Sequence, residues 1–97
     1  MKILAIEKAV PGADHGRSDT LLLQEEAKCA WRLHQSGQIR ELYFRSDKDE
    51  AILVLECDTV DQATSVLSTL PLVREGLIEF EVIPLKAYPG FGRLFVE

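Results

Sequence analysis

The sequence predicts an α+β domain in which two helices cover one face of an antiparallel sheet. Three observations predict it: an amphipathic helical stretch that ends at a glycine, two neighbouring strand-like segments joined by a short polar turn, and a second helix before a last strand. The chain has 97 residues, which suffice for one domain with one core. Hydrophobic residues make up 46% of it and charged residues 28%, which is ordinary for a globular protein and disfavours a disordered chain.

Residues 2–7 predict a short strand, because apolar side chains dominate it and alternate between two faces. Leu4 and Ile6 share one face of this strand. The other face holds Ile3, Ala5 and Glu7. Residues 9–18 follow as a loop, since they include the structure-breaking residues Pro11, Gly12 and Gly16. His15 in this loop is a candidate substrate-binding residue, and the alternative is an ordinary solvated side chain.

The next segment predicts an amphipathic helix. Asp19 or Ser18 can cap its first free amides, and Gly37 ends it. At about 100° per residue, one stripe of this helix holds Leu22, Leu23, Cys29, Ala30, Leu33 and His34. Glu26 falls inside this stripe, where a core residue is expected. Trp31 lies near its edge, either as a candidate substrate-binding residue or as a ring that covers the core.

Residues 39–45 predict the second strand, in which alternation places Arg40 on the same face as Leu42 and Phe44. If helix and strand pack together, Glu26 and Arg40 face one layer, as a buried ion pair or as the lining of a pocket. A half-buried carboxylate can act as a general base, and an arginine can anchor a carboxylate or stabilise an enolate. Glu26 and Arg40 are therefore the candidate catalytic residues.

A polar turn of hairpin length leads to residues 51–57, whose uninterrupted apolar centre predicts a strand covered on both faces. Thr59 and Gln62 form a capping box that begins a second helix, and this helix ends before Pro71. Residues 77–85 predict the last strand. The order βαββαβ is that of the ferredoxin-like fold, with a four-stranded antiparallel sheet.

The sheet face away from the helices is expected to mix apolar and charged side chains. We assign to it Ile3, Ala5, Glu7, Glu41, Tyr43, Arg45, Ile52, Val54, Glu56, Glu79 and Glu81. Such a face suits pairing with a second copy, which predicts a homodimer. Residues 1–97 are expected to form a single domain with its core at about 2–85. Residues 86–97 are apolar enough to dock on the domain itself or on a neighbouring subunit, and Tyr88 is a candidate substrate-binding residue there.

A formal net charge of −5 argues against nucleic acid as a partner, because binding to phosphates requires a basic face. The apolar run before Glu7 is too short for a signal sequence, and no run of about eighteen apolar residues occurs, so a cytoplasmic protein with no membrane partner is expected. Cys29 and Cys57 have no CxxC spacing and no histidine cluster beside them. Buried free thiols are therefore favoured over a disulfide or a metal pair.

A family resemblance is carried by residues 26–37, 40–43, 70–72, 78–82 and 85–89. These segments resemble the muconolactone delta-isomerase family of the dimeric α+β barrel superfamily, in which a helical glutamate and an arginine match Glu26 and Arg40. The resemblance implies a lactone isomerase that uses no metal and no organic cofactor, and dimers that assemble further into decamers. The family has histidines where this chain has Leu4, Glu41 and Tyr88, which points away from muconolactone itself as the substrate.

Three functions follow as hypotheses. The first is a cofactor-free enzyme that shifts a proton in a small lactone or a related carboxylic acid. The second is a non-catalytic dimeric module that binds a small acid or assembles, with Glu26 and Arg40 as structural partners. The third is a cofactor-independent monooxygenase of the same fold, which needs a pocket sized for an aromatic substrate. An open cavity walled by a Glu26 oxygen would favour the first over the second.

Overall fold

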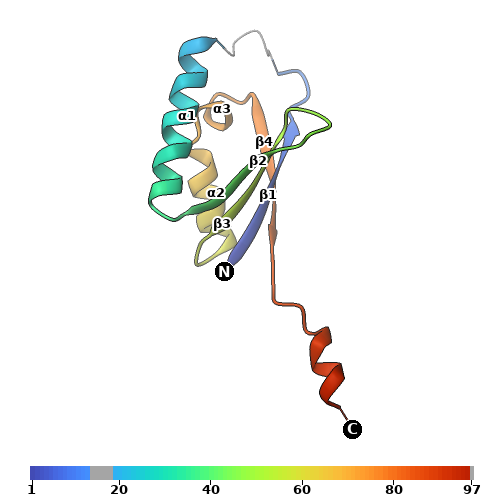
Figure 1. Cartoon of the computed structure of the whole chain (residues 1–97). Coiled ribbons are helices and arrows are strands. Elements are labelled where there is room, and N and C mark those ends of the chain that lie inside the picture. The colour runs from blue at the N-terminus through green and yellow to red at the C-terminus, as the bar shows by residue number, and fades with distance from the viewer. Residues whose placement is uncertain (14–18, 97) are drawn as a thin grey trace.

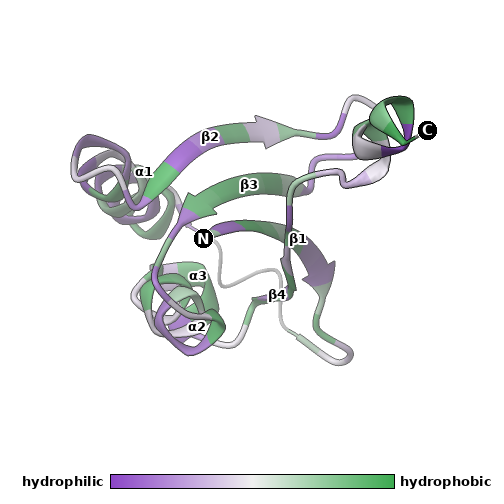
Figure 2. Cartoon of the chain, turned by 90° about the horizontal axis from the view of Figure 1, so that it is seen from below, coloured by the Kyte–Doolittle hydropathy of each residue, from purple (hydrophilic) through white to green (hydrophobic). Residues whose placement is uncertain are grey.

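The computed structural model describes residues 1–13 and 19–96, and it confirms the predicted α+β architecture (Figure 1). Its elements are β1 (Lys2–Ala9), α1 (Thr20–Gln35), β2 (Ile39–Phe44), β3 (Ala51–Glu56), α2 (Val60–Ser68), α3 (Pro71–Arg74), β4 (Ile78–Pro84) and the 3-10 helix η2 (Gly90–Phe95). The strands form one antiparallel sheet in the order β2-β3-β1-β4. Helices α1, α2 and α3 lie on one face of this sheet (Figures 1 and 2).

The helix ends follow from local sequence signals. The Asp19 carboxylate accepts a hydrogen bond from the Leu22 amide at 2.8 Å and so caps α1. Gly37 follows α1 with a φ of 84°, a left-handed conformation that glycine adopts without strain. The Thr59 hydroxyl accepts from the Gln62 amide at 3.0 Å, as the predicted capping box requires. Pro71 then begins α3, a short extra helix that the sequence reading did not include.

The core lies between the inner strands and the three helices. It consists of Ile3, Ala5, Cys29, Ile39, Leu53, Leu55, Cys57, Ala63, Val66, Leu67 and Leu70. The two cysteines in this set are buried and carry free thiols, as their spacing favoured. Cys29 is the one buried residue of α1, whereas α2 has three, so α1 packs less deeply than α2 and leaves room beneath it.

The predicted assignment of β1 side chains to the two sheet faces is wrong. Alternation holds along the strand, but Ile3 and Ala5 are fully buried beneath the helices, and Glu7 lies on that same face. Leu4 and Ile6 occupy the opposite face instead, where their neighbours in β3 also point. A period of two identifies which side chains belong together, but it does not say which set meets the helices.

The sheet face away from the helices is uncovered in the described part of the chain (Figure 2). Its centre is an apolar strip of Leu4, Ile6, Ile52, Val54 and Ile83, which neighbour one another across the strands. Charged groups flank this strip, and one pair of them, Lys8 and Glu81, forms a salt bridge of 2.8 Å. We call this surface the open face.

The C-terminal segment extends away from the sheet and carries η2 at its far end (Figure 1). It gives the molecule a longest dimension of 61 Å, against 28 and 23 Å in the other directions. Its large side chains are exposed, namely Tyr88, Phe91, Leu94, Phe95 and Val96. Docking of this segment on a neighbouring subunit stays a prediction. None of the helices in residues 1–13 and 19–96 combines the length and apolarity that crossing a bilayer requires.

Candidate active site

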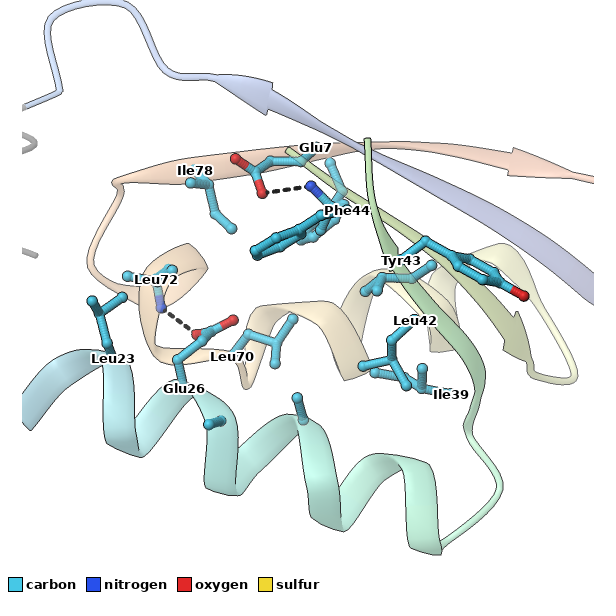
Figure 3. Close-up of a pocket in the computed structure, with 15 residues that line it drawn as sticks. Glu7, Leu23, Glu26, Ile39, Leu42, Tyr43, Phe44, Leu70, Leu72 and Ile78 are labelled. Atoms are coloured by element: carbon cyan, nitrogen blue, oxygen red, sulfur yellow. Dashed lines mark hydrogen bonds between the residues drawn. The ribbon is translucent and has the colours of Figure 1, made fainter. Parts of the chain in front are cut away.

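A cavity of about 470 Å³ opens between α1, α3 and the helix-covered face of the sheet (Figure 3). Its walls are mainly apolar and include Leu23, Leu42, Phe44, Leu70, Ile78 and Phe80. The charged groups among its described lining residues are two carboxyls, Glu7 and Glu26. The volume and the apolar lining with few polar groups are those of a small-molecule site.

Glu26 enters the cavity from the α1 side and is partly buried. Its Oε1 accepts a hydrogen bond from the Leu72 amide at 2.9 Å, while its second oxygen points toward the cavity (Figure 3). The Leu72 amide is available because it lies in the first turn of α3, where amides have no partner inside the helix. The break at Pro71 therefore creates the donor that orients the Glu26 carboxyl.

The pKa of Glu26 is raised from its ordinary value of 4.5, chiefly because burial disfavours the ionised form. The hydrogen bond from the Leu72 amide acts in the opposite direction. The negative charge of Glu7 raises the pKa of Glu26 further, and the positive charge of Arg74 lowers it slightly. Glu26 is thus a stronger base than a fully exposed glutamate, as proton abstraction from carbon requires.

Glu7 lines the same cavity from the sheet side, near the end of β1 (Figure 3). Its Oε1 accepts a hydrogen bond from the Ala51 amide at 3.0 Å, across to the start of β3. Burial raises the pKa of Glu7, and the negative charge of the neighbouring Glu50 raises it further. The hydrogen bond from the Ala51 amide acts in the opposite direction and lowers the pKa of Glu7. The sequence reading did not select Glu7, although the signal was present: it alternates with Ile3 and Ala5, and that set proved to face the helices.

The prediction that Arg40 faces one layer with Glu26 is wrong. Strand β2 contains a bulge at which Ile39 pairs with Leu55 while Glu41 already pairs with Val54, so Arg40 is the extra residue between them. Ile39 turns inward, and the Arg40 side chain is exposed. Its Nε donates a hydrogen bond to the carbonyl oxygen of Gly37 at 2.6 Å. The two candidate catalytic residues therefore do not form an ion pair.

Two of the three candidate substrate-binding residues, Trp31 and Tyr88, do not line the cavity. Trp31 is 59% exposed on the outer side of α1, where its ring lies 6.1 Å from the ring of His34. Tyr88 is 65% exposed in the C-terminal segment, with its ring packed edge-on against Phe91. His15 lies outside the described residues.

The arrangement suits acid–base chemistry on a small apolar molecule. Two carboxyls, each oriented by a backbone amide, meet an apolar cavity from a helix and from a strand. Over residues 1–13 and 19–96, no three His, Cys, Asp or Glu side chains gather closely enough to hold a metal ion.

No protein-family model and no curated protein matches the sequence. Among solved structures, the chain is similar to muconolactone isomerase, with a TM-score of 0.73, 24% sequence identity and coverage of 92% of each chain. It is also similar to the 5-chloro-2-hydroxyhydroquinone dehydrochlorinase of Burkholderia phenoliruptrix AC1100, solved in complex with 2,5-dihydroxybenzoquinone. That match has a TM-score of 0.60 and 21% identity, and it covers 93% of this chain and 98% of the other. These two similarities show that the chain has the fold of these proteins, as the resemblance implied.

Proposed function

We propose that this chain, which shares the fold of muconolactone isomerase, is a cofactor-free enzyme that moves a proton within a small unsaturated lactone or a related acid. The observation that carries the proposal is the partly buried Glu26 carboxyl on the wall of an open cavity. The two similar structures are named as an isomerase and a dehydrochlorinase. Shifting the double bond of a lactone requires a proton to leave carbon, so a base in this position suits that reaction.

Glu26 is the general base in this mechanism. Its free oxygen takes a proton from the carbon beside the lactone carbonyl, and the electrons of that C–H bond move into a dienolate. The γ-carbon then accepts a proton, which leaves the double bond conjugated with the carbonyl. The Leu72 amide holds the Glu26 carboxyl in one orientation, so the Glu26 side chain loses less conformational entropy when the substrate binds.

A second candidate function is a non-catalytic module that binds a small molecule. The position of Arg40 favours it, because an exposed arginine bonded to the Gly37 carbonyl does not stabilise an enolate inside the cavity. Among the described lining residues, no other cation takes that place. Proton exchange on carbon separates the two functions, since a binding module would not accelerate it.

Pairing of two copies through the open face belongs to the same proposal. An apolar strip with charges at its margin is the composition expected of a dimer interface. The exposed aromatic side chains of the C-terminal segment support its docking on a neighbouring subunit. Assembly into a decamer and a cytoplasmic location stay predictions.

The test uses α-angelica lactone, an uncharged unsaturated lactone whose conversion to the conjugated β-isomer is followed by proton NMR. The wild-type protein should exceed the buffer rate, and Glu26→Gln should lower the enzymatic rate by about a hundredfold or more, the usual contribution of a general base. Glu25→Gln is the matched control, because Glu25 is the exposed neighbour on α1 and does not line this cavity. Its rate should stay within about twofold of wild type.

Two results would contradict the proposal. Equal rates for wild type and Glu26→Gln would remove Glu26 from the mechanism. Saturable binding of the lactone with no acceleration over buffer would establish the binding module instead.

A further inference from the structure

We propose that Glu7 is the second proton-transfer group of this cavity, and that the two carboxyls restrict its ligands to uncharged molecules. Of the substrates named in the proposed function, this keeps the lactones and excludes acids in their ionised form. The transfer step rests on the proposed function. The restriction to uncharged ligands is a property of binding, and it can be measured whether or not the protein is a catalyst.

The geometry places the two carboxyls on different walls. Glu7 reaches the cavity from β1 and Glu26 reaches it from α1 (Figure 3). One oxygen of each carboxyl accepts a hydrogen bond from a backbone amide rather than from the other carboxyl. The amides of Ala51 and Leu72 thus hold two separate acids around one apolar space. A small ring between them can meet one acid at each end.

The charges around the cavity oppose an anionic ligand. Glu50, at the end of the hairpin, lies near Glu7, but its carboxylate is paired with Lys48 at 3.3 Å and with Arg45 at 3.9 Å. The positive charge of Arg74 on α3 has only a small effect on Glu26, so the two lining carboxyls dominate the charge at the cavity. No lysine or arginine lines the cavity among residues 1–13 and 19–96. A ligand carboxylate would lose its hydration against apolar walls and meet two carboxylates without a counter-ion. An uncharged lactone or ester meets no such opposition.

The second carboxyl also completes the proton transfer. In molecules with Glu26 ionised and Glu7 protonated, a state that is lost as the pH rises and Glu7 ionises, Glu26 removes the proton beside the carbonyl and Glu7 gives its proton to the γ-carbon of the dienolate. Glu26 is then protonated and Glu7 ionised, and exchange with solvent water restores both. Burial raises the pKa of each group, which lets Glu7 keep its proton in less acidic solution than an exposed glutamate would.

The binding test compares two ligands that differ by one charge: a carboxymethyl-substituted unsaturated lactone and its methyl ester. NMR titration at pH 7.5, where the free acid is an anion, should give at least tenfold tighter binding of the ester by wild type. Glu7→Gln should reduce that preference to about threefold or less, because it removes one negative charge while its amide oxygen can still accept from Ala51. Glu50→Gln, which leaves both lining carboxyls in place, should keep the full preference.

The transfer test is the pH profile of isomerisation of α-angelica lactone. Wild type should show a bell-shaped profile, since it needs Glu26 ionised and Glu7 protonated, and Glu7→Gln should be slower and lose the decline on the alkaline side. Unchanged rate and profile in Glu7→Gln would overturn the role of Glu7 as donor.

Equal wild-type affinity for acid and ester would overturn the charge restriction, and that measurement needs no variant. A protein that binds the ester selectively but isomerises nothing would refute the proposed function and leave the charge restriction standing.

Discussion

Replacing Glu26 by Gln should leave the fold at least as stable as wild type at pH 8. Both side chains can accept the hydrogen bond from the Leu72 amide, so the difference between them is the ionised carboxyl. The pKa of Glu26 is raised in the folded state, so protonation of Glu26 favours folding. This contribution to the free energy of unfolding is complete below about pH 4.5 and is lost as the pH rises through the folded-state pKa. The glutamine does not titrate. Wild type should therefore lose stability relative to Glu26→Gln between pH 4.5 and pH 8.

The size of this difference is limited by the partial exposure of Glu26. Solvent screens a carboxylate that is not fully enclosed, so we expect the variant to gain about 1 kcal/mol or less at pH 8. Glu26→Ala also removes the acceptor of the Leu72 amide, and it should lower the free energy of unfolding by about 1 kcal/mol.

The assay is urea unfolding followed by circular dichroism at pH 5 and pH 8, at one protein concentration so that self-association affects all variants alike. Glu25→Gln, on the exposed side of α1, should show no comparable pH-dependent gain. If Glu26→Gln is less stable than wild type by more than about 1 kcal/mol at pH 8, the ionised carboxylate has a stabilising ion partner and our account of this site is wrong.

Other substitutions test the rest of the structure. Arg40→Ala should keep the isomerisation rate within about twofold and lower stability by less than about 1 kcal/mol, because it loses one exposed hydrogen bond; a hundredfold loss of rate would return Arg40 to the site. Leu55→Ala should lower the free energy of unfolding by about 3 kcal/mol in urea titrations, since Leu55 is fully buried. Val54→Lys, on the open face, should weaken self-association in sedimentation, and unchanged association would place the interface elsewhere. Phe95→Ala should leave the unfolding free energy of the domain unchanged but reduce self-association, because Phe95 is 81% exposed.

Much of the fold could be predicted from local patterns. The capping residues Asp19 and Thr59, the stop at Gly37 and the apolar run of β3 after a polar turn each act within a few residues, so they located the helices and the hairpin correctly. The position of Glu26 within an apolar helical stripe was also visible, and the structure places that carboxyl at a cavity wall. These features depend on spacing along the chain.

The composition of the site depended on contacts between distant segments. The bulge that turns Arg40 outward arises where β2 meets β3, and no residue of β2 marks it in isolation. The packing of the helices on one side of the sheet decides which face of β1 is buried, and Glu7 lies on that face. Strand alternation alone does not determine which of the two faces the helices cover. The sequence by itself therefore determined the four strands and the two longer helices, and that one acid lies among apolar residues. The tertiary structure decided that its companion in the cavity is a second carboxyl rather than an arginine, because the register between strands and the packing of layers set the direction of every side chain.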